Sequence, residues 1–532
     1  MIISQAIGDY GRWQFILTLL LAFCNIPSTF HIFVPTFHAR ALDTWCARPA
    51  NFTEVDPLQW RQKTQKPNDY CKVIREQDLK LQDGELQVAV DAKYIDCTTW
   101  EFDGEGSTLI TEYGLLCSKA NLISIAEMVF LGGVAVGGLV SGIISDRYGR
   151  KKTLLGSVAI QTILGVIIAF NPWFEMYLFL RAILGFVSVS VVFSGFVLSI
   201  ELVGGVWRTV AGISYLFPTS ISFGLISAIA YFIRDWRTLQ LAISLPGALI
   251  LSYWWFVPES PRWLLAMGRT AEVLKILETA AKFNNRKLPA NIDKQLLPTS
   301  NSINNETMGV MDLFKTPKLR KITLCLFVIW FSVYFIYYGI TLNLGNIGGD
   351  LYLASALSGL VEVPALAISI AILLKMGRRW PLALTVFFSG CFCLMIIPVP
   401  YVLNNAQWLI TSFAMSGKFL IAASNSIMPV FTAELYPTKI RNIGVGANNV
   451  PAGIALMLVP YLWDMAMFHE CVPMSILGVS GLVGGSIVLL LPETGNSQLQ
   501  ESIENSSDEE LFKKTNKIMV ESCSNNGSAA SM

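Results

Sequence analysis

Twelve runs of mostly apolar residues, each long enough to cross a lipid bilayer, constrain this chain more than any other feature of its sequence. About 20 helical residues span the roughly 30 Å hydrocarbon core of a membrane. Because a helix satisfies its own backbone hydrogen bonds there, we expect an all-α membrane protein with twelve transmembrane helices. The runs cover residues 15–37, 122–144, 153–170, 176–199, 208–232, 239–257, 321–343, 350–374, 381–400, 407–432, 444–463 and 473–491.

Composition supports a membrane protein and argues against several other classes. Of the 532 residues, 53% are hydrophobic and 14% are charged, which is too apolar for an ordinary soluble protein. A formal net charge of +1 leaves no large basic face for nucleic acid. The three histidines, His31, His38 and His469, are too few for a metal cluster. We therefore expect no metal, no cofactor and no enzymatic activity.

Lysine and arginine gather in alternate loops between the runs, and such loops face the cytoplasm in membrane proteins. This pattern places both termini in the cytoplasm. The first run is long enough to span the bilayer and lacks a short core followed by a small-residue cleavage site, so we expect it to be helix 1 and not a cleaved signal peptide. The basic residues of these loops are Arg147, Arg150, Lys151, Lys152, Arg208, Lys318, Arg320, Lys321, Lys375, Arg378, Arg379, Lys439 and Arg441.

The segment 40–121 is then a large extracellular loop. It contains four cysteines, Cys46, Cys71, Cys97 and Cys117, and a glycosylation sequon at Asn51. An even number of cysteines outside the cell favours disulfides, and four cysteines allow three pairings between which the sequence does not choose. We expect Asn51 to carry a glycan.

The remaining polar segments divide the chain into domains. We expect an N-terminal six-helix bundle over residues 1–257, a cytoplasmic linker over 258–320 and a C-terminal six-helix bundle over 321–491. The linker contains a short amphipathic helix at 271–283. The polar tail, 492–532, is expected to be disordered.

An internal repeat relates the two bundles. Loop residues recur at offsets of 228, 233 and 234: Gly149 and Arg150 with Gly377 and Arg378, Glu201 and Arg208 with Glu434 and Arg441, and Pro258 and Glu259 with Pro492 and Glu493. A nearly constant offset across three loops indicates two halves related by an axis along the membrane normal. The substrate path is then expected between the halves, at the midplane.

Several motifs resemble those of known transporters. The loop at 137–153, GGLVSGIISDRYGRKKT, is similar to the loop after helix 2 in the major facilitator superfamily. Other stretches resemble the organic ion transporter family, which handles organic cations, carnitine-like zwitterions and organic anions. These are GDYGRWQ at 8–14, STLITEYGLLC at 107–117, PESPRWL at 258–264, GGDLYL at 348–353 and ELYPTKIRN at 434–442. The resemblance implies an alternating-access carrier of small organic ions at the plasma membrane.

Four charged residues lie within the apolar runs, where a charge costs at least about 2.5 kcal/mol at the helix centre. They are Glu127, Arg181, Glu362 and Lys418. Arg181 and Lys418 are predicted near helix starts, where they snorkel or brace a neighbouring helix. By resemblance Glu362 binds the substrate cation, and the alternative is a structural ion pair. Glu127 is either a second negative site or lies at the wet outer end of helix 2.

Aromatic residues in the seventh run, Trp330, Tyr334, Tyr337 and Tyr338, are candidates for cation–π contacts with an ammonium group, the alternative being packing. By resemblance Trp330 and Tyr337 match cavity positions. The position that separates cation carriers (Asp) from anion carriers (Arg) is occupied here by Gly453, so a neutral or zwitterionic substrate becomes credible. Polar Asn448 and Asn449 beside Pro451 predict a broken helix 11.

Charged loop residues resemble the cytoplasmic latch of the superfamily, which closes the inner gate in one state. The expected members are Asp146, Arg147, Arg150, Glu201, Arg208, Glu434 and Arg441. Their alternative role is to hold the loops inside. For the chain as a whole we favour a carrier of organic cations or zwitterions. The alternatives are an organic anion exchanger and a non-transporting scaffold or receptor.

Overall fold

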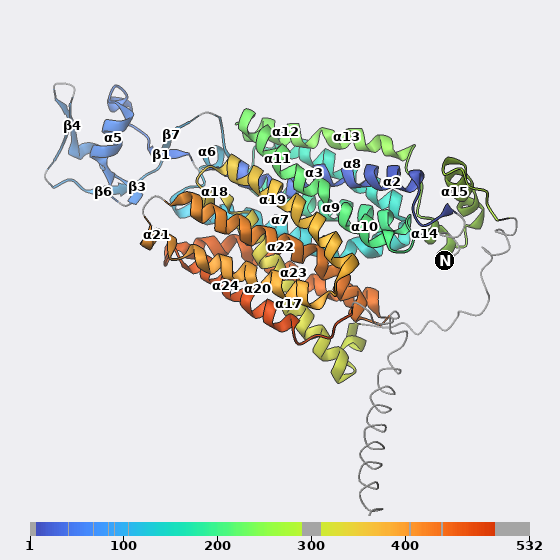
Figure 1. The fold of residues 1–532 in the computed structure, drawn as a ribbon. Helices are drawn as coiled ribbons and strands as arrows, with labels where there is room; N and C mark the ends of the chain where they lie inside the picture. The colour runs from blue at the N-terminus through green and yellow to red at the C-terminus, as the bar shows by residue number, and fades with distance from the viewer. Residues whose placement is uncertain are drawn as a thin grey trace, which may run out of the picture.

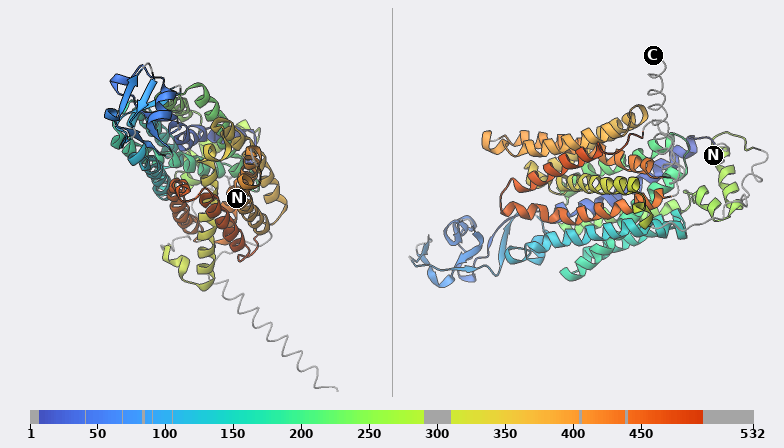
Figure 2. Two further views of the ribbon diagram at one scale, coloured as in Figure 1. Left: turned by 90° about the vertical axis from the view of Figure 1, so that its left-hand side faces the viewer. Right: turned by 90° about the horizontal axis from the view of Figure 1, so that it is seen from below.

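In the computed structural model the helices form two bundles side by side, with short strands beyond one end (Figure 1). The structure describes residues 7–289 and 310–494 with short gaps at 41, 68, 83–84, 90, 105, 404–405 and 438–439. The expected disordered tail falls almost wholly outside these residues. We call the end of the bundles next to the strands the strand end, and the opposite end, where α15 (Thr270–Phe283) lies, the linker end (Figure 2).

In the N-terminal bundle the chain runs from one end of the bundle to the other six times. Prolines begin several segments, since a proline lacks the N–H that an interior helical position must donate; Pro35, Pro218 and Pro246 stand at such starts. The segments are α2 (Arg12–Phe23), α3 (Asn25–Phe33) and α4 (Pro35–His38); α7 (Asn121–Tyr148); α8 (Arg150–Phe170); α9 (Phe174–Glu201); α10 (Trp207–Ser214) and α11 (Phe217–Phe232); and α12 (Trp236–Ser244), α13 (Pro246–Ile250) and η4 (Leu251–Trp254).

In the C-terminal bundle the chain also runs from one end to the other six times. The expectation of a broken helix 11 is wrong, because α23 runs without interruption through Pro451 and Pro460. Asn448 lies inside it and donates to the carbonyl of Gly444 at 2.7 Å. The elements are η5 (Val310–Phe314), α17 (Pro317–Thr341), α18 (Leu344–Gly348), α19 (Leu351–Lys375), α20 (Arg379–Ile396), α21 (Val399–Val402), α22 (Gln407–Leu435), α23 (Arg441–Asp464), η6 (Met465–Met467) and α24 (Val472–Val488).

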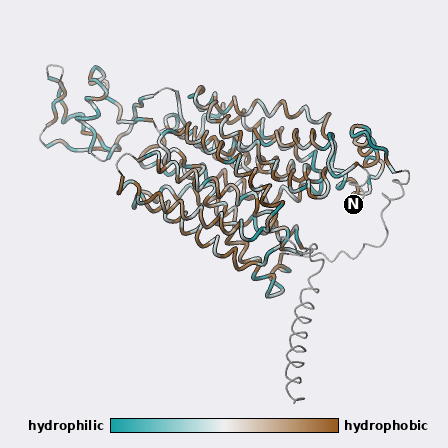
Figure 3. Tube along the Cα trace, viewed as in Figure 1, coloured by the Kyte–Doolittle hydropathy of each residue, from teal (hydrophilic) through white to brown (hydrophobic). Residues whose placement is uncertain are grey.

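Length and hydropathy identify most of these passages as membrane helices. Nine helical passages of the described chain are long and apolar enough to cross a bilayer, and α24 is a shorter apolar helix. Hydrophobic residues line the bundles, whereas the strands and α15 are more hydrophilic (Figure 3). The architecture agrees with the expected twelve-helix membrane fold, and the bundles are all-α as expected, with short strands only in the segment outside them.

Helices of the two bundles meet along two seams, α7 with α23 and α11 with α19. At the strand end of the α7–α23 seam, the Ser124 hydroxyl donates to Asp464 at 3.1 Å. A Cβ added to Gly142 or Gly446, nearer the linker end, would meet nothing within 4 Å. Because α7 and α23 are antiparallel, the contact between Ser124 and Asp464 would place Gly142 opposite Gly446 further along the seam. The two helices therefore contact each other at the strand end and are apart at the linker end.

The extracellular loop expected at 40–121 contains a small β-structure that the sequence analysis did not predict. Its sheets pair β1 with β7, β3 with β2 and β6, and β4 with β5, all antiparallel. Disulfides join Cys46 to Cys97 and Cys71 to Cys117. The elements are β1 (Asp43–Cys46), η1 (Ala50–Phe52), α5 (Pro57–Thr64), β2 (Gln65–Lys66), β3 (Asp69–Ile74), η2 (Glu76–Asp78), β4 (Leu79–Gln82), β5 (Glu85–Val88), β6 (Tyr94–Asp96), β7 (Trp100–Asp103), α6 (Leu109–Tyr113) and η3 (Cys117–Lys119).

Candidate functional site

A row of aromatic rings crosses from one bundle to the other. On α17, Trp330 stacks on Tyr334 with centroids 5.7 Å apart, and Tyr334 stacks on Tyr338 at 6.1 Å. Their spacing of four residues places them on one helix face. Tyr338 then stacks on Phe33 of α3 at 5.9 Å, and Phe33 contacts Phe223 of α11 at 4.4 Å. The row therefore presents ring surfaces at the junction of the bundles.

A buried ion pair lies beside this row in the C-terminal bundle. Lys418 Nζ is 3.3 Å from Glu362 Oε2, and the two side chains are 0% and 4% exposed. Tyr337 donates its hydroxyl to Glu362 at 2.9 Å, and Lys418 donates to Thr341 Oγ1 at 2.5 Å. The ammonium also lies 3.4 Å from the centroid of the Tyr337 ring. Every charge in this group has a close partner, as a buried pair requires.

Lys418 was expected near a helix start, and this expectation is wrong. The residue lies well inside α22, which begins at Gln407, and its side chain is fully buried. It therefore does not snorkel to the membrane surface. The apolar run alone did not reveal the partner, because Glu362 comes from a helix more than fifty residues earlier in the chain.

The N-terminal bundle contains a second acid and base, Glu127 on α7 and Arg181 on α9. Both line a small hollow together with Tyr177. Arg181 is 1% exposed, donates to the carbonyl of His31 at 3.3 Å and lies 4.1 Å from the Phe130 ring centroid. Glu127 forms no hydrogen bond or close ion pair with any described residue. Its carboxylate is thus available to a ligand.

Glu127 also lines a larger cavity of about 590 Å³ at the strand end, between the two bundles. Asp464, which accepts from Ser124, lines the same space. Across the cavity, Arg40 donates to the hydroxyl of Tyr352 at 2.6 Å. Acidic groups and an arginine therefore face one space that both bundles enclose.

Gly453 lies in the closed part of the α7–α23 seam. A Cβ added at Gly453 would lie 2.6 Å from the Cβ of Ala135, closer than side chains approach one another. The glycine allows the two helices to approach closely. A charged side chain at this position would separate α7 from α23 in this conformation, which gives a packing reason for the absence of the usual Asp or Arg.

Four of the residues expected in a cytoplasmic latch form ion pairs, each within its own bundle. Arg150 pairs with Asp146 at 2.6 Å and with Glu201 at 3.2 Å. In the other bundle Arg378 pairs with Glu434 at 3.2 Å. All three pairs lie at the linker end, and the Arg150–Glu201 pair corresponds to the Arg378–Glu434 pair, so the sequence repeat is also a structural repeat.

The other expected latch residues form no ion pair among the described residues. Arg208 donates to the carbonyl of Val203 at 3.1 Å. The guanidinium of Arg147 lies 5.7 Å from the Tyr148 ring centroid. Arg441 has two buried nitrogens without a hydrogen-bond partner in the described chain. Among the described residues, the expected latch thus contains some residues that form ion pairs and others that do not.

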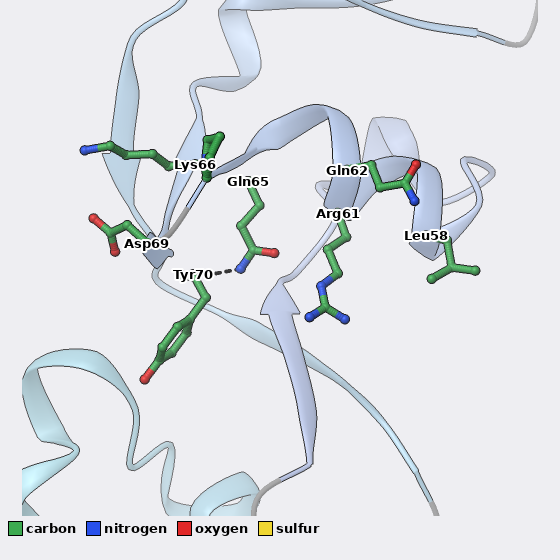
Figure 4. A pocket seen from close by; sticks show the side chains of 8 residues that line it. Leu58, Arg61, Gln62, Gln65, Lys66, Asp69 and Tyr70 are labelled. Carbon is green, nitrogen blue, oxygen red and sulfur yellow. Dashed lines mark hydrogen bonds between the residues drawn. The ribbon is translucent and has the colours of Figure 1, made fainter. Parts of the chain in front are cut away.

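The external β-structure has an open hollow of its own, of about 570 Å³, beside β2 and β3 (Figure 4). Gln65 donates to the carbonyl of Tyr70 across one side of it at 2.9 Å. Asn51 is exposed on the same structure. None of the residues that we predicted to bind substrate lines this hollow.

Comparison with known proteins decides the family. Residues 98–505 match the family model described as "Sugar (and other) transporter". The "Organic cation transporter protein" of Drosophila melanogaster is 34% identical, over 94% of this chain and 92% of that protein. Human "Solute carrier family 22 member 13" is 33% identical, over 94% and 91%. The chain belongs to solute carrier family 22, the organic cation transporter family.

A third relative of this family 22 transporter is the human "Organic cation/carnitine transporter 2", 30% identical over 94% of this chain and 93% of that protein. Among solved structures, the xylose transporter XylE from E. coli in a partially occluded inward open conformation gives a TM-score of 0.63 at 15% identity. The match covers 92% of this chain and 100% of XylE. At this identity it establishes the major facilitator fold alone. Both resemblances noted in the sequence are confirmed.

Proposed function

We propose that this family 22 transporter carries small organic cations or carnitine-like zwitterions across the plasma membrane by alternating access. The observation that carries the proposal is the aromatic row between the bundles, with the carboxylate of Glu362 beside it through Tyr337. A second acid, Glu127, lines a cavity that both bundles enclose. Aromatic faces attract ammonium groups by roughly 0.5–2 kcal/mol each and tolerate varied shapes. Carboxylates in a low-dielectric site add charge selectivity.

The balance of charge supports a cation or a zwitterion over an anion. Each acid has a base in its own bundle, Arg181 for Glu127 and Lys418 for Glu362. Asp464 adds a further acid at the cavity near Glu127. A substrate with an ammonium and a carboxylate would find partners of both signs. The relatives named for organic cations and for carnitine agree with this choice.

Glu362 is proposed to bind the ammonium group by competition with Lys418. In the conformation seen here the lysine occupies one side of the carboxylate, at 3.3 Å. A substrate cation that approaches along the aromatic row would share or replace this contact. Trp330, Tyr334 and Tyr338 would then contact its apolar parts, while Tyr337 holds the carboxylate in place at 2.9 Å.

Orientation follows from opposite chemistry at the two ends. Disulfides and the exposed sequon asparagine Asn51 belong to the strand end, and both are features of an extracellular surface. Basic loop residues such as Arg150 and Arg378 belong to the linker end. We therefore propose that the strand end is extracellular and that both termini are cytoplasmic.

Alternating access is proposed to use the two seams between the bundles. In this conformation α7 and α23 touch at the strand end and separate toward the linker end, which is inward-facing in the proposed orientation. In the opposite state the helices would meet at Gly142 and Gly446, and the latch arginines would hold that closure. The latch residues should therefore shift the inward/outward equilibrium more than substrate recognition.

Uptake into cells that express the chain tests the proposal. We would compare one labelled quaternary ammonium, one carnitine-like zwitterion and one aromatic carboxylate at two membrane potentials. We expect uptake of the ammonium or the zwitterion, with ammonium uptake falling on depolarisation because a cation is driven inward by a negative interior. Uptake of the carboxylate alone would establish the anion exchanger. No uptake of any of the three, with the protein at the surface, would favour the scaffold or receptor.

A further inference from the structure

A basic groove lies at the linker end, away from the substrate path. It has a volume of about 440 Å³ and lies between the start of α8, the segment after η4, and the helices α14 (Pro261–Ala266) and α15. Four cationic side chains from separate parts of the chain line it: Lys151, Lys152, Arg269 and Lys275. The fold thus brings cations together that are over one hundred residues apart in sequence.

The acids of this groove are already engaged. Glu259 accepts hydrogen bonds from the backbone N–H of Lys151 at 2.9 Å and of Ser260 at 3.0 Å. Glu272 forms an ion pair with Arg269. Lys151, Lys152 and Lys275 form no ion pair with any described residue. Three ammonium groups are therefore available for an anionic ligand.

Aromatic side chains place the groove at the height of a bilayer surface. Trp254, which lines it, is 52% exposed, and the adjoining Trp255 and Phe256 are more exposed still. Tryptophan is enriched where lipid headgroups meet hydrocarbon. Lys151 Nζ lies 5.1 Å from the centroid of the Trp254 ring, so a cation and an aromatic ring share one wall.

We propose that this groove binds the phosphorylated headgroup of an anionic membrane lipid. A phosphate monoester carries close to two negative charges and several acceptor oxygens, which suits three neighbouring ammonium groups. The acyl chains would lie against Trp254, Trp255 and Phe256 at the bundle surface. The same lipid would join α8, which spans the bilayer, to the linker helix α15.

A membrane lipid is favoured over a free phosphate compound because the exposed aromatic residues border the groove. A soluble anion would use the lysines and gain nothing from Trp255 or Phe256, which are 78% and 68% exposed. A lipid uses both surfaces at once. Basic clusters next to a membrane helix attract anionic headgroups by about 1 kcal/mol for each Lys or Arg.

The purified full-length protein, reconstituted into phosphatidylcholine vesicles, tests the proposal through its affinity for a labelled anionic lipid in the same vesicles. The vesicles contain either a small fraction of phosphatidylinositol bisphosphate or enough phosphatidylserine to give the same surface charge. We compare the wild-type chain with Lys152→Gln/Lys275→Gln and with a control of equal charge, Lys282→Gln/Lys287→Gln, whose lysines are exposed outside the groove. Melting temperature in neutral lipid checks that each variant folds.

We expect tight retention of phosphatidylinositol bisphosphate by the wild-type chain and the control, and at least about a tenfold loss of affinity in the groove variant. Equal affinity of the groove variant and the control would overturn the site. Equal affinity for the two anionic lipids would overturn recognition of a phosphorylated headgroup. Binding of soluble inositol trisphosphate as tight as that of the lipid would show that the ligand is a free phosphate compound, against the proposal.

Discussion

Each bundle carries one acid and one base on equivalent helices, but the two pairs are built differently. Glu362 follows Glu127 by 235 residues, and Lys418 follows Arg181 by 237, close to the offsets of the loop repeat. Glu362 and Lys418 are in direct contact at 3.3 Å, with hydroxyl partners on both. Glu127 instead lines two cavities and has no close partner among the described residues.

The difference separates a carboxylate that already has a cation partner in this conformation from one that has none among the described residues. Breaking a direct buried pair leaves an uncompensated charge, which is costly in stability. A carboxylate at a cavity wall retains access to water and ligands, so its removal affects stability less and binding more. The two pairs thus occupy equivalent positions in the repeat, but a ligand would have to displace Lys418 to reach Glu362, whereas Glu127 has no such partner to displace among the described residues.

The largest effect is expected from Lys418→Met, which leaves Glu362 without its cation. We expect a loss of about 3–5 kcal/mol in the free energy of unfolding, measured by thermal denaturation in detergent. Arg181→Met is the matched variant in the other bundle. Its loss should be smaller, about 2 kcal/mol from the contact with Phe130, because Glu127 remains open to the cavity. Equal losses in the two variants would remove the contrast.

A smaller loss is expected from Tyr337→Phe. The hydroxyl of Tyr337 donates to Glu362 at 2.9 Å, and hydrogen bonds to charged groups contribute about 1.5–3 kcal/mol. Tyr334→Phe is the control, because its hydroxyl forms no hydrogen bond with the described residues. The control should stay within about 0.5 kcal/mol of the wild type by the same denaturation measurement. A control as unstable as Tyr337→Phe would mean that ring packing, not the hydrogen bond, is measured.

Glu127→Gln should have the smallest effect on stability, under about 1 kcal/mol, since the carboxylate has no bond to lose. Its effect should appear in transport, as a rise of about tenfold in the KM for a quaternary ammonium. Glu175→Gln, an exposed acid at the start of α9, is the control for the loss of one negative charge. A KM that rises equally in both variants would indicate general electrostatic attraction instead of a binding contact.

The membrane fold could be predicted well from the sequence because each membrane passage is a long, mostly apolar run of residues. The sequence did not predict contacts between residues that lie far apart in the chain. The four cysteines allowed three pairings, and the structure joins Cys46 to Cys97 and Cys71 to Cys117. The short strands of the external region lie in a polar segment with no strong alternation, so their pairing also escaped prediction.

The candidate site was predictable in its members but not in its contacts. Glu127, Glu362 and the aromatic residues of α17 stood out because charges and clustered rings are unusual in membrane helices. Which base contacts which acid depends on helix rotation, which no single run specifies. One signal was available, since extending the repeat offset to the acids would have related Glu127 to Glu362. Asn448 and Pro451 misled us about α23, because the helix continues through the proline and the Asn448 amide donates to the Gly444 carbonyl of the same helix and to the Tyr436 hydroxyl.

Uptake of a quaternary ammonium by Glu362→Gln/Lys418→Met, per copy at the cell surface, tests most directly whether Glu362 binds the substrate. The double variant removes both charges together, so it should fold and reach the surface where Lys418→Met alone fails. We expect uptake at least about tenfold below the wild type. Wild-type uptake by the double variant would contradict the proposal and show that Glu362 and Lys418 form a structural ion pair.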